Sequence, residues 1–215
     1  MSDQPVAVTL LPSRDTVRTM GVSPTGFAIA ELSEVIRRCN PNLNAMHSIL
    51  WKVEGAIEPS WIHWMETCFE PFLLPHLQQV LEFSARQSAK EIILLDVALG
   101  KFLTGSSCDR SIKAGQFLLQ QKTPRGERII MRLQDAIDNG IAFGHFTTLY
   151  GVRCGTFSIP VRTAILSYLL QELMLGAPKE EAPVRLKLLE ATVESVNEFL
   201  RGPSSGSSES MCFHG

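Results

Sequence analysis

The amino-acid sequence predicts an all-α protein, a compact bundle of about nine or ten helices in a single domain. Three observations lead to this prediction. Apolar residues recur at helical spacing through most of the 215 residues, and capping residues, proline and glycine mark where these segments start and stop. No stretch keeps the alternation of apolar and polar residues between hairpin turns that strands require, although the short apolar run Val6–Leu11 could form one strand.

The first third of the chain carries four weakly marked helices. Pro71 and Pro75 should break or bend the chain between the third and the fourth. Trp61 and Trp64 begin an apolar stripe that we expect to lie in the core first and to line a binding groove second. The four predicted helices are Phe27–Arg38, Leu43–Glu54, Ser60–Glu70 and Leu73–Arg86.

The clearest helix is Ser88–Thr104. Ser88 and Glu91 have the spacing of a capping box, an apolar stripe follows, and Gly105 suits a left-handed exit. Asp96 lies among apolar residues, but helical rotation places it away from the stripe, so we expect it to face solvent or a partner. A buried carboxyl with a raised pKa is the alternative.

Four further helices are predicted in the second half, and their ends carry the usual signals. They are a weakly marked helix at Asp109–Gln121, one opened by Thr123-Pro124 and closed by Asn139-Gly140, one capped by Ser158 and ending at Gly176, and a last one through Leu189 to Leu200 that stops at Gly202-Pro203.

Glycine marks the weakly helical stretch Ile141–Cys154. Gly144, Gly151 and Gly155 each lower helical stability there, so we expect Gly144 and Gly151 to allow a close helix crossing, which makes Phe143–Cys154 a central buried helix. His145 in this stretch is then a hydrogen-bonded histidine of the core or of an interface.

Composition excludes several classes of protein. A net charge of -2 gives no basic excess for a phosphate backbone, so we expect no nucleic-acid partner. The 5 cysteines form no Cys-x-x-Cys pair, which fits a reduced cytoplasmic chain. We find no secretion signal in residues 1–19 and no apolar run long enough to span a membrane, so no membrane partner is expected.

The sequence holds no signature of catalysis or of tight metal binding. The phosphate-binding loop, the zinc-protease motif and the nucleophile elbow do not occur. The 5 histidines lie far apart and lack partners at metal-ligand spacing. Cys212 and His214 could offer two soft ligands, but they would bind a nickel or zinc ion weakly and nonspecifically. We therefore expect no catalytic residue, no cofactor and no metal site.

Two blocks of residues, taken in order, resemble the urease accessory protein UreF family. The first block is Leu95-Asp96, Leu99, Arg110-Ser111, Gly115 and Leu118-Leu119, and the second is Gly144-His145, Tyr150-Gly151 and Tyr168-Leu169. The aromatic segment Trp61–Leu77 and the opening Ser23–Ala28 are similar to the same family. The resemblance covers about two thirds of the chain, and the chain is identified as a diverged member.

The resemblance implies an all-α protein that is not an enzyme. UreF-like proteins form dimers, bind the accessory protein UreD (also called UreH) and recruit the nickel-carrying GTPase UreG, and the assembly delivers nickel to apo-urease. It implies that nickel is handled by the complex rather than held tightly by this chain. The motif residues expected to pack or to bind partners are Arg110, Ser111, Gly115, Gly144, His145, Tyr150, Gly151 and Tyr168.

The domain organisation that follows is an N-terminal segment at 1–22, a helical UreF-like domain at 23–202 and a Ser/Gly-rich tail at 203–215. We expect the tail to be mobile in the free protein. Met211 and Phe213 could fasten onto a groove of a partner, and a spacer without a role is the alternative.

Two other functions remain open at this stage. One is a helical enzyme whose acid and histidine groups, Asp96 and His145, converge only in the fold; a polar pocket enclosing both would favour it. The other is a helical adaptor unrelated to urease.

Overall fold

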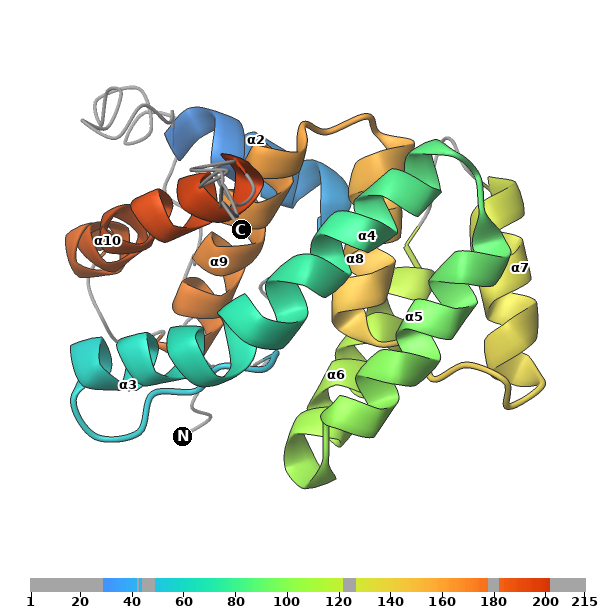
Figure 1. Cartoon of the computed structure of the whole chain (residues 1–215), viewed down its shortest axis with the longest axis horizontal. Coiled ribbons are helices and arrows are strands. Elements are labelled where there is room, and N and C mark those ends of the chain that lie inside the picture. The colour runs from blue at the N-terminus through green and yellow to red at the C-terminus, as the bar shows by residue number, and fades with distance from the viewer. Residues whose placement is uncertain (1–28, 42, 44–48, 122–126, 178–181, 202–215) are drawn as a thin grey trace, which may run out of the picture.

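The computed structural model describes residues 29–41, 43, 49–121, 127–177 and 182–201 (Figure 1). These residues form helices and no strand, so the all-α prediction is confirmed for them. The elements are α2 (Ile29–Cys39), α3 (Ile57–Trp64), the π-helix η2 (Met65–Leu73), α4 (Leu74–Ala85), α5 (Ala89–Phe102), α6 (Gly105–Leu119), α7 (Glu127–Asp138), α8 (Phe146–Thr156), α9 (Val161–Gly176) and α10 (Ala182–Arg201).

The chain from α3 to α4 is one continuous helical rod, which bends where the π-helix lies (Figure 1). Pro71 lies inside η2, and Pro75 lies in the first turn of α4, where a missing N–H costs little. The wider π-helical turns accommodate Pro71, so the chain bends without the break that we allowed for. Counted as continuous rods, the described residues form 8 helices; the expected nine or ten referred to the whole chain.

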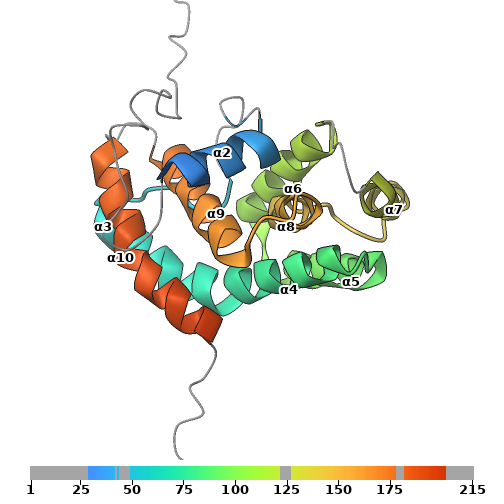
Figure 2. The same ribbon diagram turned by 90° about the horizontal axis from the view of Figure 1, so that it is seen from above.

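Helices α8 and α9 form the centre of the protein. Every residue from 146 to 154 and from 164 to 176 is buried. Helices α4 and α6 pack on α8, while α2 and α10 pack on α9, as Figure 2 shows from above. The predicted central helix therefore exists, but it begins at Phe146 and not at Phe143.

A chain of aromatic rings runs through this centre. Trp61 and Trp64 are 1% and 9% exposed, which confirms the prediction that their stripe belongs to the core. Neighbouring ring centroids lie 4.9 to 6.1 Å apart, the range of favourable ring contacts. The rings in order of contact are those of Trp51, Trp61, Trp64, Phe69, Tyr168 and Tyr150.

Several predicted helix ends differ from the observed ones. Residues 49–54 are not helical, so the prediction of a helix to Glu54 is wrong there. Ser88 is the N-cap of α5 but its side chain makes no capping hydrogen bond, so the capping box is wrong. Gly105 has the expected positive φ of +53° yet begins α6. Pro160, and not Ser158, is the N-cap of α9.

Other predicted features lie outside the described residues. These are the strand at 6–11, the segments 1–22 and 203–215, the opening motif at 23–28, the Thr123-Pro124 helix start and the Gly202-Pro203 stop. Within the described residues, no helix combines the length and the apolar character needed to cross a membrane.

Candidate functional site

The buried carboxylate of Asp96 holds the segment that leads into α8. Its Oδ2 accepts hydrogen bonds from the backbone N–H groups of Phe143 (2.7 Å) and Gly144 (2.8 Å), and its Oδ1 accepts one from that of His145 (2.9 Å). The side chain is 0% exposed, so the expectation that it faces solvent or a partner is wrong. Asp96 follows Ile92 by four residues and precedes Leu99 by three, so helical spacing places it on the buried face of α5, and the loop before α8 packs against it there.

The first motif block contacts the second block at this point. Ser111 on α6 accepts a hydrogen bond at Oγ from the N–H of Phe146, the first residue of α8. Asp96 and Ser111 together therefore satisfy backbone donors at the start of α8, where a helix has no partners of its own and a carboxylate is favoured.

Two glycines make the contact between α6 and the loop before α8 close. A Cβ on Gly115 would lie 1.8 Å from the backbone oxygen of Gly144, a distance that real atoms do not adopt. Gly144 itself has a φ of +74° and lies outside the helix, so our assignment of it to a helical stretch is wrong. It is glycine because the loop turns through the left-handed region there.

His145 is buried, but it is not the hydrogen-bonded core histidine that we expected. Both ring nitrogens lack a hydrogen-bond partner, and the ring packs against that of Phe143 with centroids 5.5 Å apart. Burial lowers the pKa of His145, which the Asp96 charge partly counteracts. The Asp96 carboxylate bonds the backbone N–H of His145, so the two side chains do not form an acid–base pair.

A second buried histidine, His76 on α4, lies in the same region. Its Nε2 is 3.0 Å from Thr148 Oγ1 on α8. Burial lowers the pKa of His76 to about 4, against the opposite effect of Asp96. The ring is therefore neutral near pH 7 and serves to join α4 to α8.

Tyr150, Gly151 and Tyr168 pack inside the protein. Tyr168 Oη is 2.9 Å from Thr147 Oγ1, and burial raises the pKa of both tyrosines. A Cβ on Gly151 would lie 2.7 Å from Val80 Cγ1 on α4. The expected close crossing at Gly151 is therefore confirmed, and it joins α8 to α4.

Arg110 and a residue that the sequence analysis missed, Glu172, hold the extended segment before α3. Arg110 donates to the carbonyl oxygens of Ile49 (3.2 Å) and Leu50 (3.3 Å). Glu172 Oε2 accepts from the N–H groups of Leu50 (3.0 Å) and Trp51 (2.9 Å). The available signal for Glu172 was that it is the one charged residue in the mostly apolar stretch 164–176 of α9.

Glu172 is completely buried, and its Oε1 has no hydrogen-bond partner. Burial raises its pKa to about 7, although the N–H groups of Trp51 and Leu50 act in the opposite direction. The carboxyl of Glu172 is therefore partly protonated near neutral pH.

The remaining predicted site residues, Met211 and Phe213, lie outside the described residues, as do Cys212 and His214. Among the residues that the structure describes, no three His, Cys, Asp or Glu side chains gather as they would around a metal ion.

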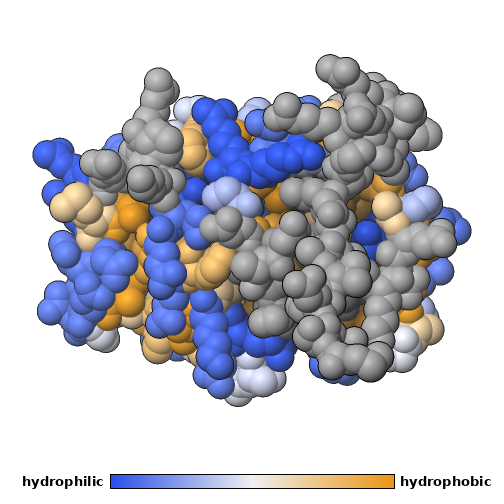
Figure 3. All heavy atoms as spheres, turned by 180° about the vertical axis from the view of Figure 1, so that it is seen from behind, coloured by the Kyte–Doolittle hydropathy of each residue, from blue (hydrophilic) through white to orange (hydrophobic). Residues whose placement is uncertain are grey.

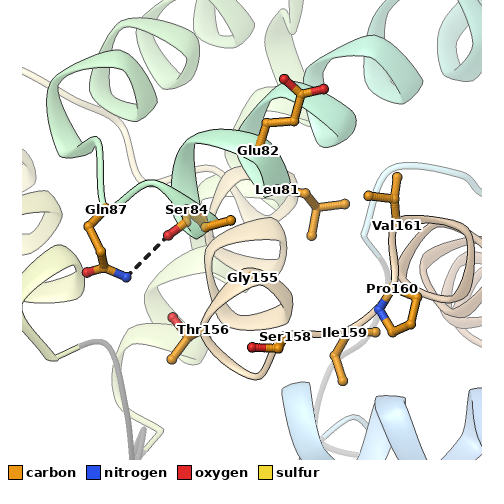
Figure 4. A pocket seen from close by; sticks show the side chains of 11 residues that line it. Leu81, Glu82, Ser84, Gln87, Gly155, Thr156, Ser158, Ile159, Pro160 and Val161 are labelled. Atoms are coloured by element: carbon orange, nitrogen blue, oxygen red, sulfur yellow. Dashed lines mark hydrogen bonds between the residues drawn. The ribbon is translucent and has the colours of Figure 1, made fainter.

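Two of the surface hollows are lined by described residues alone. One, of about 590 Å³, lies where α4 and α8 end and α9 begins (Figure 4). The other, of about 550 Å³, is an open groove between α5 and α7, and it includes the exposed side chains of Leu94 and Ile141. Neither includes Asp96 or His145.

Comparison of the chain with known protein families, with curated proteins and with solved structures finds no match.

Proposed function

We propose that this protein is a urease accessory scaffold of the UreF kind. In this proposal, a single helical domain over residues 23–202 acts as a homodimer in the cytoplasm. It bridges a UreD-like protein and a UreG-like GTPase and so promotes nickel insertion into apo-urease. Three observations support this proposal. The two motif blocks pack against each other, the motif residues are buried, and apolar side chains are exposed at the surface.

The observation that carries the proposal is that the two motif blocks pack against each other. Asp96 and Ser111 bind backbone groups of residues 143–146, and Gly115 lies directly on Gly144. Residues that resemble one family only by their order in the sequence thus meet at one junction in the fold. A chance set of common residues has no reason to converge in this way.

The burial of these motif residues supports a structural role for them in this proposal. Ser111, Gly144, His145, Tyr150 and Tyr168 are completely or almost completely covered. They position helices and do not touch a partner. Partner binding then belongs to the outer helix faces that this junction holds in place.

Exposed apolar side chains are the surface feature that a scaffold requires. Leu94 and Ile141, each 61% exposed, lie in the groove between α5 and α7. Figure 3 shows apolar residues reaching the surface among hydrophilic ones on the side where α7 lies. We assign this groove to one of the two partner proteins.

The alternative of a helical enzyme using Asp96 and His145 is disfavoured by their geometry. Both side chains are 0% exposed, and the Asp96 oxygens are already occupied by backbone N–H groups. A substrate has no access to them in this conformation. An adaptor unrelated to urease remains the alternative that the next experiment tests.

The test is a pull-down of the affinity-tagged chain co-expressed with a UreD-like and a UreG-like protein. Capture of both partners in one complex supports the proposal, and capture of neither by the folded chain contradicts it. Leu94→Lys should weaken capture without changing the melting temperature. Ile62→Lys, a similar change at an exposed apolar residue of α3, is the matched control and should bind as the wild type does.

A further inference from the structure

Exposed apolar side chains gather along the groove between α5 and α7, two helices that lie side by side at the edge of the protein (Figure 1). Leu94 and Ile141, each 61% exposed, line this groove, and Ile93 lines it with them. Exposed apolar residues are ordinary when they are scattered singly over a surface. Several of them along one groove indicate a surface that a partner covers.

The apolar surface continues along α5 beyond the groove. Val97 follows Ile93 by one turn of the helix and is half-buried. One turn further on, the ring of Phe143 lies against Gly100, where a Cβ would be 2.5 Å from two carbons of the ring, and this ring is 43% exposed. We call the whole surface the apolar strip; it consists of Ile93, Leu94, Val97, Ile141 and Phe143.

Basic side chains border the apolar strip. On α5, Lys90 and Lys101 lie about three turns apart, so they project from the same side of the helix, one at each end of the strip. On α7, Arg132 lines the groove and Arg128 lies one turn before it. All four are exposed, and none of them forms an ion pair with another residue that the structure describes.

Acidic side chains are fewer at this surface. Asp135 on α7 is the acid in the groove lining, whereas Glu91 and Asp138, on the same two helices, do not line it. The groove therefore carries a local positive charge in a chain whose net charge is -2. Such a local charge attracts a partner of opposite sign and disfavours others.

The shape of the groove favours a helix as its occupant. A groove bordered by two helices accepts a third one whose apolar face lies along it. The distance between Lys90 and Lys101, about 16 Å along the helix axis, matches about three turns of such a helix. A lipid bilayer also attracts basic and apolar groups together, but its surface is flat and would not fill a groove.

We infer that the groove between α5 and α7 binds an acidic amphipathic helix, about three turns long, that belongs to a partner protein. The apolar face of this helix packs on the apolar strip, and its Asp and Glu side chains pair with Lys90, Lys101 and Arg132. The inference rests on the proposed function, and it names the kind of segment that occupies the groove assigned there to a partner.

The test uses the full-length protein and two labelled, end-blocked peptides of about 15 residues, followed by fluorescence anisotropy. The acidic peptide carries leucines at helical spacing, glutamates beside them and alanine elsewhere, and the basic peptide has lysine in place of each glutamate. At about 0.05 M salt, the acidic peptide should bind saturably and at least about tenfold more tightly than the basic one. Its affinity should fall at about 0.3 M salt. Equal affinities of the two peptides, or no saturable binding of the acidic one, would overturn the inference.

Reversal of the groove charges tests where the peptide binds. Lys90→Glu combined with Arg132→Glu should weaken binding of the acidic peptide about tenfold and strengthen that of the basic one. Lys113→Glu combined with Lys187→Glu, at exposed residues of α6 and α10, changes the net charge equally and is the control. If both double variants bind the two peptides alike, the attraction does not come from the groove and the inference fails.

A neutral substitution tests the apolar strip. Leu94→Ser should weaken binding of the acidic peptide about fivefold without lowering the melting temperature, because the leucine is exposed in the free protein. Ile62→Ser, at an apolar residue of α3 that is 47% exposed, is the matched control and should bind as the wild type does. Equal affinities of these two variants would contradict the contact with Leu94.

Two further results separate this inference from its alternatives. Vesicles of phosphatidylcholine and phosphatidylserine should not sediment the protein; sedimentation that the Lys90→Glu, Arg132→Glu variant loses would assign the surface to a membrane and overturn the inference. Peptide binding by a chain that captures neither a UreD-like nor a UreG-like protein contradicts the proposed function alone. Capture of both by a chain that does not bind the acidic peptide contradicts this inference alone.

Discussion

The buried carboxylate of Asp96 positions the segment that leads into α8. Asp96 accepts three backbone hydrogen bonds from residues 143–145 while it is completely buried. Hydrogen bonds to a charged acceptor are stronger than those between neutral groups, and here they offset the free-energy cost of burying the carboxylate. This residue of the first motif block, which binds the backbone of residues 143–145, is therefore structural.

Asp96→Asn tests this role. The amide keeps the shape, but it loses the charge and turns a donor toward backbone N–H groups, so we expect a loss of about 2 to 4 kcal/mol in the free energy of unfolding. Urea unfolding measures the loss. Asp109→Asn, at an exposed aspartate on α6, is the control and should change it by less than about 0.5 kcal/mol. Equal stabilities of the two variants would contradict the role of Asp96.

Glu172 makes stability depend on pH. Its pKa rises from 4.5 to about 7 on folding because of burial, so between these values the folded protein holds a proton that the unfolded chain releases. The free energy of unfolding therefore falls as pH rises through this window. Relative to Glu172→Gln, which has no such proton, the wild type should lose about 3 kcal/mol between about pH 4.5 and 7.

Urea unfolding of both proteins at a series of pH values measures this difference. His76 and His145, whose pKa values burial lowers, contribute with the opposite sign, but they are present in both proteins and cancel. Parallel stability curves for the wild type and the glutamine variant would show that Glu172 ionises as an ordinary exposed glutamate does.

Among the secondary-structure elements, α6 and the loop before α8 pack so closely that no side chain fits at position 115. A Cβ on Gly115 would meet the Gly144 carbonyl oxygen, which belongs to the backbone and cannot rotate away. Even Gly115→Ala should therefore destabilise the protein by about 3 kcal/mol or more, at the upper end of the cost of overpacking.

Thermal unfolding checks this prediction. Lys113→Ala, an exposed change on the same helix, is the control and should leave the melting temperature almost unchanged. If Gly115→Ala had the same melting temperature as the Lys113→Ala control, α6 and the loop before α8 would not be in contact as described.

Helical periodicity predicted most elements because each buries an apolar stripe, and this needs only local sequence. It failed where a neighbouring segment decides the outcome. Asp96 has the spacing of the buried residues Ile92 and Leu99, but the backbone donors that let a carboxylate lie there come from residues 143–145. Residues 49–51 are not helical, and Arg110 and Glu172 bind their backbone groups. Gly144 was assigned to a helix because a glycine serves either a close helix crossing or a positive φ, and the sequence does not distinguish the two.

The candidate site was predictable in its residues but not in their roles. The order of the motif residues singled out Ser111, Gly115 and Gly144, and these do meet in the structure. The glycines indicated burial for Gly144, but nothing in the spacing indicated that Ser111 and Gly115 would be buried beside it. The cavity beside Ser158 was not foreseen, because it is built from the ends of helices that are far apart in the sequence.

For the whole molecule, a scaffold function means that nucleotide hydrolysis and tight nickel binding belong to the partner proteins. The isolated protein should hydrolyse neither GTP nor ATP, because the sequence has no phosphate-binding loop. It should bind nickel only loosely, because the described residues hold no converging set of ligands. Calorimetric titration with nickel is the measurement. Tight stoichiometric binding that survives removal of residues 203–215 would contradict this prediction.

We propose that the chain promotes nickel insertion as a scaffold. The most direct test is to measure the activation of urease in its presence and absence. Apo-urease is co-expressed with UreD-like and UreG-like proteins and nickel, with or without this chain, and the purified urease is assayed for nickel content and activity. We expect both to rise only when the chain is present, Lys113→Ala to support them fully and Gly115→Ala not to do so. Unchanged nickel content and activity in the presence of the folded wild-type chain would contradict it.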